Sequence, residues 1–139
     1  MISVSEAEKI VLQNARLLPY ESISLPEAYG RVLRESISSD RDQPAFNKST
    51  MDGIAISSSA FSNGAHEFMI EGVALAGQKQ GKLKRKNGCF KIMTGAVVPH
   101  GCDCVIPIEE IVIKGKTATI TDTRSIKRGR NIRIQGADQ

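Results

Sequence analysis

Apolar and polar positions follow two different periods along the chain, and they divide it into a helical start and a longer β-rich part. Between residues 7 and 18 the apolar side chains recur at helical spacing. Ser3 and Ser5 are both candidate N-caps, each with a glutamate three residues later, and Pro19 is expected to end the helix. The sequence therefore predicts an amphipathic helix at the N-terminus.

Short extended segments are predicted after this helix, at 23–25 and 32–38, with a helical turn opened by Pro26 between them. From residue 54 onward the apolar runs are short, β-branched and separated by turn residues. These runs predict strands at 54–57, 68–75, 89–93, 104–108, 111–113, 117–121 and 131–134. Gly115 sits between two of them and predicts a hairpin. The predicted fold class is α+β and β-dominated.

Composition supports a folded chain with an aliphatic core. Of 139 residues, 40% are hydrophobic, 24% are charged and only 4% are aromatic, with no tryptophan. So few aromatic side chains argue against a stacking platform for single-stranded nucleic acid, and we expect no nucleic-acid partner. No apolar run approaches the roughly 18 residues of a membrane helix, so no membrane association is expected.

Charge is distributed unevenly. The first 72 residues hold six basic and ten acidic residues, a net charge of −4, whereas residues 73–139 hold thirteen basic and five acidic residues, a net charge of +8. This asymmetry indicates an anionic partner for the second half, with a solvated basic surface as the alternative. The basic residues gather in the predicted surface loop between Gly77 and Gly88 and again in the tail Lys127–Arg133.

The chain has three cysteines, an odd number that is typical of a reduced, cytoplasmic protein. His100, Cys102 and Cys104 would share one face of an extended segment, and Cys89 could complete a zinc site. This spacing matches no known zinc finger, and buried cysteines that serve as small apolar core residues are the favoured interpretation.

Two polar turns are candidates for chemistry. Asp52 stands before Gly53 at the end of a long polar loop that begins at residue 40, and such a loop could present Asp52 to a cation. Thr94 and Gly95 follow a predicted strand, where exposed N–H groups could bind an anion. The alternatives are an ordinary Asp-Gly turn and an ordinary strand-to-loop turn. Glu109 and Glu110 end another predicted strand, so only one of them could enter a given site.

The order of these blocks is more informative than any one of them. Taken together, PAFNKSTMDGIAIS, KIMTGAVVPHGCDCVIPIEE and KRGRNIRIQGAD resemble the N-terminal half of the molybdopterin molybdenumtransferase (MoeA) family, which includes the E domain of gephyrin. The resemblance implies two lobes: an elongated α+β lobe built from residues 1–45 and 125–139, and a β-rich lobe, residues 46–124, inserted into it.

The resemblance also implies an activity. Family enzymes insert molybdate into adenylylated molybdopterin with the help of Mg²⁺, releasing AMP and the molybdenum cofactor. They are homodimers whose active site lies in a cleft between subunits, and a MogA-type adenylyltransferase supplies their substrate. The family's pterin-binding domain would lie after residue 139, so we expect a fragment that is inactive alone. The unpaired last strand leads to the same expectation. The alternative function is a non-catalytic scaffold module of gephyrin type.

Site residues carry over by motif position. The resemblance implies catalytic roles for Asp52, Thr94 and Glu109, with Asp52 also binding the metal. It implies substrate-binding roles for Asn47, Ser49, Gly95 and Asp103. Asn47 departs from the aspartate that many relatives have, and an amide cannot ionise as a metal ligand would. We expect Asp52 and Thr94 to meet in space and to stay accessible to solvent.

Overall fold

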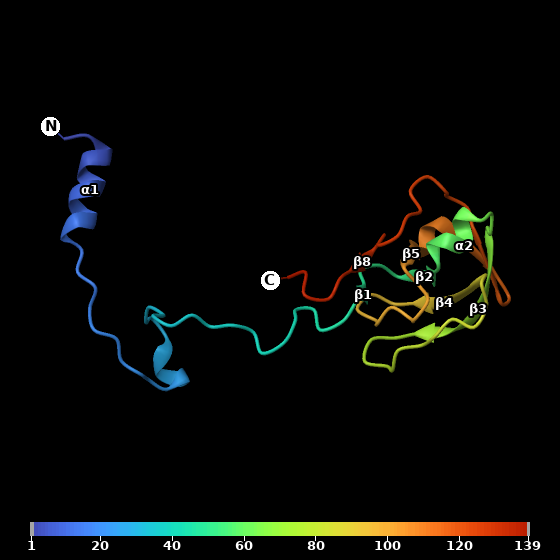
Figure 1. Cartoon of the computed structure of the whole chain (residues 1–139), viewed down its shortest axis with the longest axis horizontal. Helices are drawn as coiled ribbons and strands as arrows, with labels where there is room; N and C mark the ends of the chain where they lie inside the picture. Colours follow the sequence, from blue (N-terminus) through green and yellow to red (C-terminus); the bar gives the residue numbers. More distant parts are fainter. Residues whose placement is uncertain (1, 139) are drawn as a thin grey trace. The chain divides into compact units, whose positions relative to one another are not determined.

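The computed structural model describes residues 2–138, and the chain divides into two compact units, Met1–Ser38 and Ser39–Gln139. Figure 1 shows the first unit as helix and irregular chain and the second as a curled sheet. The predicted division into residues 1–45 with 125–139 and residues 46–124 stays a prediction, although residues 125–138 belong to the same compact unit as the sheet.

In the first unit, helix α1 (Val4–Asn14) begins with the predicted capping box. The Glu6 N–H donates to Ser3 Oγ at 3.3 Å, and the Ser3 N–H donates to Glu6 Oε2 at 2.7 Å. The helix ends at Asn14, five residues before Pro19, and the Asn14 side chain donates to the Ile10 carbonyl at 2.8 Å. A single turn of 3₁₀ helix, η1 (Leu25–Ala28), confirms the predicted helical turn.

The predicted strands at 23–25 and 32–38 are wrong. Both segments lack strand structure, because no extended neighbour within residues 2–38 offers them the hydrogen-bonding partner that a strand requires. The longest helix of the described residues, α1, has 11 residues, and no helix in residues 2–138 is long and apolar enough to cross a bilayer.

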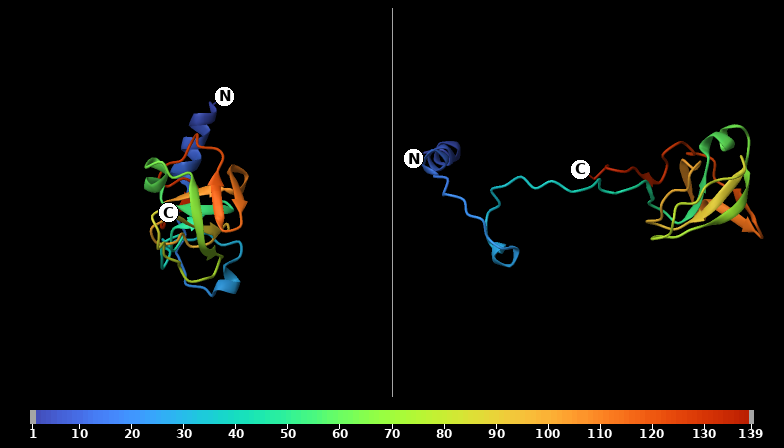
Figure 2. Two further views of the ribbon diagram at one scale, coloured as in Figure 1. Left: turned by 90° about the vertical axis from the view of Figure 1, so that its right-hand side faces the viewer. Right: turned by 60° about the horizontal axis from the view of Figure 1, so that its bottom comes forward.

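The second unit is built on a six-stranded sheet with the order β5-β2-β4-β3-β7-β6. Its neighbours are antiparallel except for the parallel pair β3 and β4. The strands are β2 (Gly53–Ile56), β3 (Glu67–Ala74), β4 (Gly88–Ile92), β5 (Cys104–Pro107), β6 (Ile111–Lys114) and β7 (Thr117–Ile120). Short helices α2 (Ser58–Ser62) and η2 (Ile108–Glu110) follow β2 and β5, and Figure 2 gives two further views. The predicted hairpin at Gly115 joins β6 and β7.

The central strand β2 is buried on both faces. Ile54 and Ile56 pack into one apolar cluster with Phe68, while Ala55 packs into a second cluster with Ile92. A strand covered on both sides reads as a continuous apolar run, which is the pattern of residues 54–56. This two-sided burial fixes the register of β2, because a shift of one residue would exchange its two faces.

Two cysteines belong to this core. Cys89 and Cys104 are fully buried, and burial raises the pKa of Cys89 to about 12 and the pKa of Cys104 to about 11. Both side chains pack among apolar residues of the core, as the favoured interpretation of these cysteines expects. Within residues 2–138 no group of three or more His, Cys, Asp or Glu side chains is placed to hold a metal ion.

The last strand has a partner, contrary to expectation. Strand β8 (Ile132–Arg133) pairs antiparallel with β1 (Lys48–Ser49), so its partner precedes it in the chain. In the same segment, the Asn131 side chain donates to the Val105 carbonyl at 3.0 Å. Residues 131–133 are thus attached to the sheet unit.

We predict that Phe68→Ala destabilises the sheet unit by about 3–5 kcal/mol, because Phe68 is completely buried and its removal leaves a cavity. The neighbouring residue Met69, which is 37% exposed, is the matched control, with an expected cost of about 1 kcal/mol for Met69→Ala. Urea unfolding of both variants measures the difference, and equal losses would contradict the assigned core.

Candidate functional site

The site begins at the edge of strand β2, where Gly53 lets two strands come together. A Cβ atom at Gly53 would lie 1.9 Å from the Ile106 carbonyl oxygen of β5, so no side chain fits there. The φ angle of Gly53 is 159°, a value that residues with a side chain rarely adopt, so both the backbone conformation and the close approach of β5 require glycine. Next to it, the Asp52 carbonyl accepts a hydrogen bond from the Ile108 N–H at 3.0 Å, which fixes the Asp52 backbone.

A tight turn over residues 93–96 provides the other half. The Ala96 N–H donates to the Met93 carbonyl at 3.0 Å, and Gly95 at the third position has a φ of 81°. These are the features of a type II turn, in which glycine is preferred at that position. The N–H of the second residue, Thr94, is not used within such a turn and is free to donate elsewhere.

The strand register brings the two halves together. Gly53 of β2 pairs with Ile92 of β4, so Asp52 and Met93 come next in this antiparallel pair. Asp52 Oδ1 then accepts two hydrogen bonds from Thr94, one from its backbone N–H at 2.7 Å and one from Oγ1 at 2.8 Å. Both residues are exposed to solvent. The expected meeting of Asp52 and Thr94 is confirmed.

These two bonds define the chemistry of the carboxyl group. The backbone hydrogen bond from Thr94, followed by its hydroxyl hydrogen bond, lowers the pKa of Asp52 below its ordinary value. Asp52 is therefore a carboxylate at neutral pH. Its second oxygen, Oδ2, accepts no hydrogen bond from residues 2–138 and is open to a cation or a donor group.

The predicted anion site at Thr94 is therefore already occupied from within the protein. Both Thr94 donors point to the Asp52 carboxylate, and a hydroxyl hydrogen serves one acceptor at a time. The sequence analysis expected exposed N–H groups here that could bind an anion, and the structure shows the Thr94 donors bonded to a carboxylate of the protein itself. That anion is a side chain from 42 residues earlier in the chain.

Ser49 and Gly95 connect the turn at residues 93–96 to the loop that leads to Asp52. The Gly95 N–H donates to the Ser49 carbonyl at 2.8 Å. The Ser49 side chain is almost fully buried, and its Oγ donates to the Met51 carbonyl at 2.6 Å. A buried hydroxyl that is engaged in this way shapes the loop leading to Asp52.

Asn47 also takes part in backbone contacts. Its Oδ1 accepts a hydrogen bond from the Gln135 N–H at 2.9 Å, and its carbonyl accepts one from the Val98 N–H at 3.0 Å. Asn47 thus connects the start of the β-rich segment with residue 135. An aspartate at this position would offer the same acceptor oxygen.

The other two predicted site residues, Asp103 and Glu109, form no hydrogen bond with Asp52. Since Ile56 pairs with Cys104 and Gly53 with Pro107, Asp103 and Asp52 lie at opposite ends of β2, on the order of 15 Å apart. The Asp103 carboxylate accepts hydrogen bonds from the Ser58 N–H and Oγ at 2.6 and 2.9 Å. Glu109 follows Ile108 in the chain, and its exposed side chain makes no hydrogen bond with residues 2–138.

Comparisons with known proteins identify the family of this chain. The family described as the MoeA N-terminal region (domain I and II) matches residues 2–139. The chain belongs to this family. A molybdopterin molybdenumtransferase of Synechocystis is 36% identical over 138 residues, which are 99% of this chain and 35% of that protein. One of Staphylococcus epidermidis is 36% identical over 141 residues, 99% of this chain and 33% of its own length.

Solved MoeA structures share the fold. The molybdopterin biosynthesis MoeA protein of Pyrococcus horikoshii OT3 has a TM-score of 0.76 at 28% identity, covering 96% of this chain and 36% of that chain. A second MoeA structure, also from Pyrococcus, has a TM-score of 0.72 at 24% identity and 99% coverage, and shows the fold alone. The β-dominated α+β prediction is thereby confirmed. The MoeA-family chain spans about a third of the length of these relatives.

Sequence reasoning missed one ion pair of the MoeA-family chain. Arg130 donates to both Glu110 oxygens, at 2.8 and 2.6 Å, and the two side chains are only 16% and 21% exposed. The adjacent residues Glu109 and Glu110 indicated that one of them could have a specific partner. The sequence could not show which one, because Arg130 lies 20 positions away. This bidentate, largely buried Arg130–Glu110 pair fixes the segment before β8 to η2.

We predict that Thr94→Val raises the pKa of Asp52 part of the way to its ordinary value, because the hydroxyl donor is lost and the backbone donor remains. NMR titration of the Asp52 side-chain carboxyl carbon measures the change, and Thr94→Ser, which keeps the hydroxyl, should leave the pKa low. A lowered folded-state pKa stabilises the fold at neutral pH, and this stabilisation is lost as the pH falls through that pKa. An unchanged pKa in Thr94→Val would contradict the role of the hydroxyl.

We predict that the Gln135 amide exchanges slowly with solvent, because it donates to Asn47 Oδ1, that Asn47→Asp preserves this protection and that Asn47→Ala loses it. The aspartate retains the acceptor oxygen, and the alanine removes a hydrogen bond worth about 1 kcal/mol. Amide exchange measured by NMR tests both variants. Equal protection in all three proteins would show that the Asn47 side chain does not hold this segment.

Proposed function

We propose that the chain forms part of a molybdopterin molybdenumtransferase, which inserts molybdate into adenylylated molybdopterin with release of AMP. The observation that carries the proposal is the ionised, solvent-exposed Asp52 carboxylate, held by Thr94 in a chain of the MoeA family. A fixed carboxylate with one open oxygen suits a reaction whose substrates are oxyanions handled with a divalent cation.

The residues present are compatible with Mg²⁺ as the cofactor. Mg²⁺ in proteins is commonly bound by one or two carboxylates together with substrate phosphates and water, rather than by a complete protein shell. Asp52 Oδ2 is the oxygen that would hold it. When bound, the ion supplies positive charge that stabilises the phosphate from which AMP departs.

Asp52 and Thr94 then have distinct roles. Because its pKa is lowered, Asp52 holds negative charge and is not a proton donor at neutral pH. Thr94 is a positioning residue, since both of its donors fix Oδ1 and thereby direct Oδ2. Glu109, exposed and close in the chain to the Asp52-bound Ile108, is a second acid available to the same substrate.

Three further residues form the frame of the site in this proposal. Ser49 and Gly95 fix the turn that carries Thr94, and Asn47 anchors the loop that leads to Asp52. Asp103 lies too far along β2 to reach the same substrate group. The excess of basic residues after residue 73 would attract the polyanionic pterin nucleotide at long range.

Other properties of the relatives enter as part of the same proposal. The chain spans about a third of the relatives' length, so the remaining parts of such an enzyme would supply pterin binding. We propose that the complete enzyme is a cytoplasmic homodimer and receives its substrate from a MogA-type adenylyltransferase. The chain alone is then expected to show no turnover.

The test is a chimera in which this chain replaces the matching segment of the Synechocystis relative. In a bacterial strain that lacks its own molybdenumtransferase, the chimera should restore molybdenum-cofactor synthesis, measured by nitrate reductase activity. Asp52→Ala and Thr94→Ala should each reduce this activity at least about tenfold, the loss expected for a group that fixes charge at a transition state.

Asp122→Ala is the matched control, because Asp122 is another carboxylate whose hydrogen bonds come from Arg124 and not from the site. It should leave activity unchanged. Full activity of the Asp52→Ala chimera would refute the proposed site. Cofactor synthesis by the unfused chain would refute the requirement for the other parts.

A further inference from the structure

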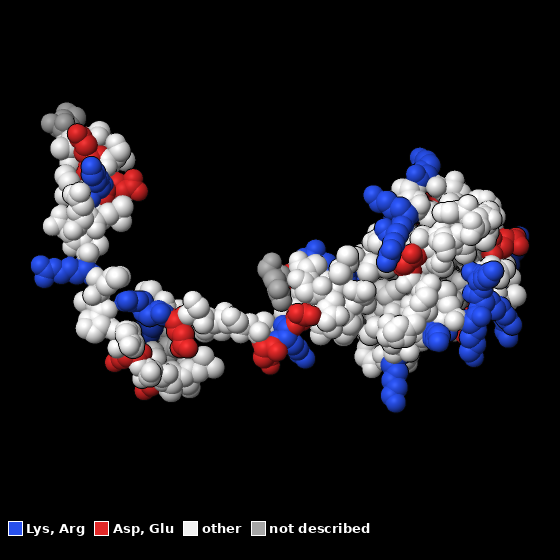
Figure 3. All heavy atoms as spheres, in the orientation of Figure 1, with Lys and Arg blue, Asp and Glu red and all other residues white. Residues whose placement is uncertain are grey.

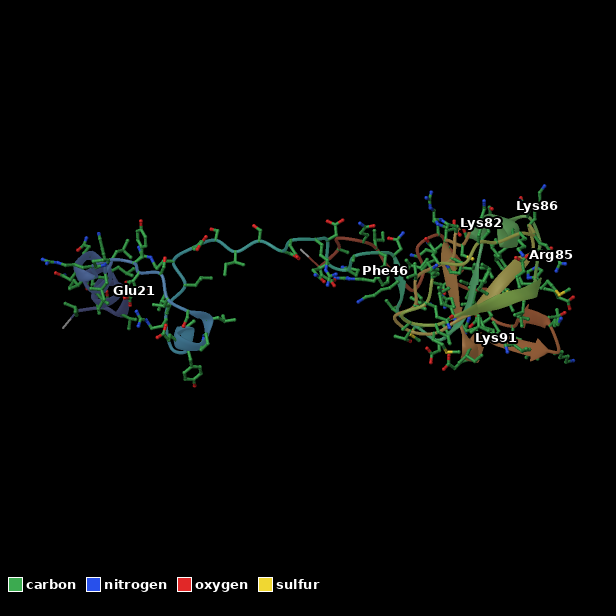
Figure 4. The ribbon with its side chains drawn as sticks, turned by 90° about the horizontal axis from the view of Figure 1, so that it is seen from below. Glu21, Phe46, Lys82, Arg85, Lys86 and Lys91 are labelled. Carbon is green, nitrogen blue, oxygen red and sulfur yellow. The ribbon has the colours of Figure 1, made fainter. Side chains whose placement is uncertain are left out.

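A concave surface lies in the sheet unit, and Asp52 is not among the residues that line it. We call it the α2 cleft. It has a volume of about 440 Å³ and lies between helix α2 with its flanking residues and the basic segment 83–86. Figure 4 shows Arg85 and Lys86 beside α2. The cleft is lined by Ser57, Ser59, Ala60, Asn63, Leu83, Lys84, Arg85, Lys86 and Gly101.

The charged residues of the lining all have the same sign. Lys84, Arg85 and Lys86 are exposed, and within residues 2–138 no carboxylate oxygen lies within 4.0 Å of their side-chain nitrogens. Figure 3 shows basic side chains as prominent features of the sheet unit's surface. Three adjacent cations that are not neutralised by a protein carboxylate create a local positive potential.

Two acids near the cleft bind other groups and do not pair with these cations. The Asp103 carboxylate accepts hydrogen bonds from the Ser58 N–H and Oγ of α2. Glu71 of β3 accepts hydrogen bonds from the backbone N–H groups of Lys84 and Arg85, at 2.8 and 2.9 Å. Each carboxylate oxygen therefore binds the backbone of the basic segment. This arrangement fixes the shape of the segment and leaves its side chains available.

Two glycines and an aromatic ring hold the start of the same loop. A Cβ atom at Gly81 would lie 2.7 Å from the Phe90 ring, and one at Gly72 would lie 2.8 Å from it. The Phe90 ring thus packs against both glycines, and a side chain at either position would require the ring to move. The Leu83 N–H donates to the His100 carbonyl at 2.9 Å, and the His100 N–H donates to the Gly81 carbonyl at 2.8 Å. The basic loop is anchored to the sheet at several points.

The opposite wall offers neutral donors. Ser57 Oγ and Ser59 Oγ form a hydrogen bond of 2.8 Å, which uses one hydroxyl hydrogen and leaves the other free to donate. The Asn63 side-chain amide forms no hydrogen bond with residues 2–138. The cleft thus combines cationic donors on one side with hydroxyl and amide donors on the other.

We propose that the α2 cleft binds the phosphate group of a small phosphorylated molecule. Cationic and neutral donors facing each other are the groups that bind phosphate oxygens. The volume is that of a small-molecule site, and the concave shape favours a small solute over a nucleic-acid strand. This site is separate from Asp52 and does not depend on the proposed function.

The first experiment titrates the ¹⁵N-labelled chain with inorganic pyrophosphate and with AMP. Saturable shifts of amides in segments 57–63 and 83–86 are expected. The double variant Arg85→Gln with Lys86→Gln should weaken pyrophosphate binding at least about tenfold, since two charge-assisted contacts are lost. The matched control is Lys114→Gln with Lys116→Gln, which removes the same charge at the β6–β7 hairpin and should leave affinity unchanged.

The second experiment asks whether Glu71→Gln strengthens or weakens the binding of pyrophosphate. This variant removes a negative charge near the cleft, so a merely positive surface would bind pyrophosphate more tightly. The carboxamide of the variant has one acceptor oxygen instead of two, so one hydrogen bond to the backbone of Lys84 or Arg85 is lost. If the fixed shape of this segment is needed for binding, pyrophosphate binds more weakly. The amide spectrum of the variant checks that the sheet unit is folded, and Glu67→Gln on the same strand controls for the charge change.

Weaker binding by Glu71→Gln together with weaker binding by the Arg85 and Lys86 double variant supports the proposal. Four results would each overturn it: no saturable binding of pyrophosphate or AMP, an equal loss in the Lys114 and Lys116 control, tighter binding by Glu71→Gln, or shifts induced by a single-stranded RNA oligonucleotide but not by the small phosphates.

Discussion

The carboxylate of Asp52 and the two donors of Thr94 form the contact on which the candidate site depends. It joins the end of one strand to a turn that follows another, 42 residues later in the chain. The contact lies at the surface and contributes little to the apolar core. Its importance is that it restricts the orientation of the Asp52 carboxylate: Oδ1 accepts two hydrogen bonds, and Oδ2 is left open. Asp103, by contrast, is engaged through both oxygens by Ser58, which gives it a structural role.

The sheet is what makes this contact possible. Strand β2 is covered on both faces, so its register cannot shift without exposing Ile54 and Ile56 or burying the wrong neighbours. That register carries Asp52 to the level of the turn after β4. The close approach of β2 and β5 at Gly53 also depends on the missing side chain. The apolar core thus positions a polar group that it does not touch.

The sequence by itself determined the features that depend on neighbouring residues. The capping box at Ser3, the turn around Gly95 and the hairpin at Gly115 follow from local chemistry, and the buried strands follow from their apolar runs. Family membership was also recognisable, because it rests on the order of short motifs. The strands expected before residue 39 failed because a strand needs a partner, and local sequence does not supply one.

Only the tertiary structure decided which groups meet. It showed that the anion bound by Thr94 is Asp52, that Glu110 and not Glu109 pairs with Arg130, and that β8 pairs with the earlier strand β1. It also placed the basic segment 83–86 against α2. Each of these contacts joins residues that are far apart in the chain. Such pairs are set by the register and packing of the whole sheet, and short-range patterns do not contain that information.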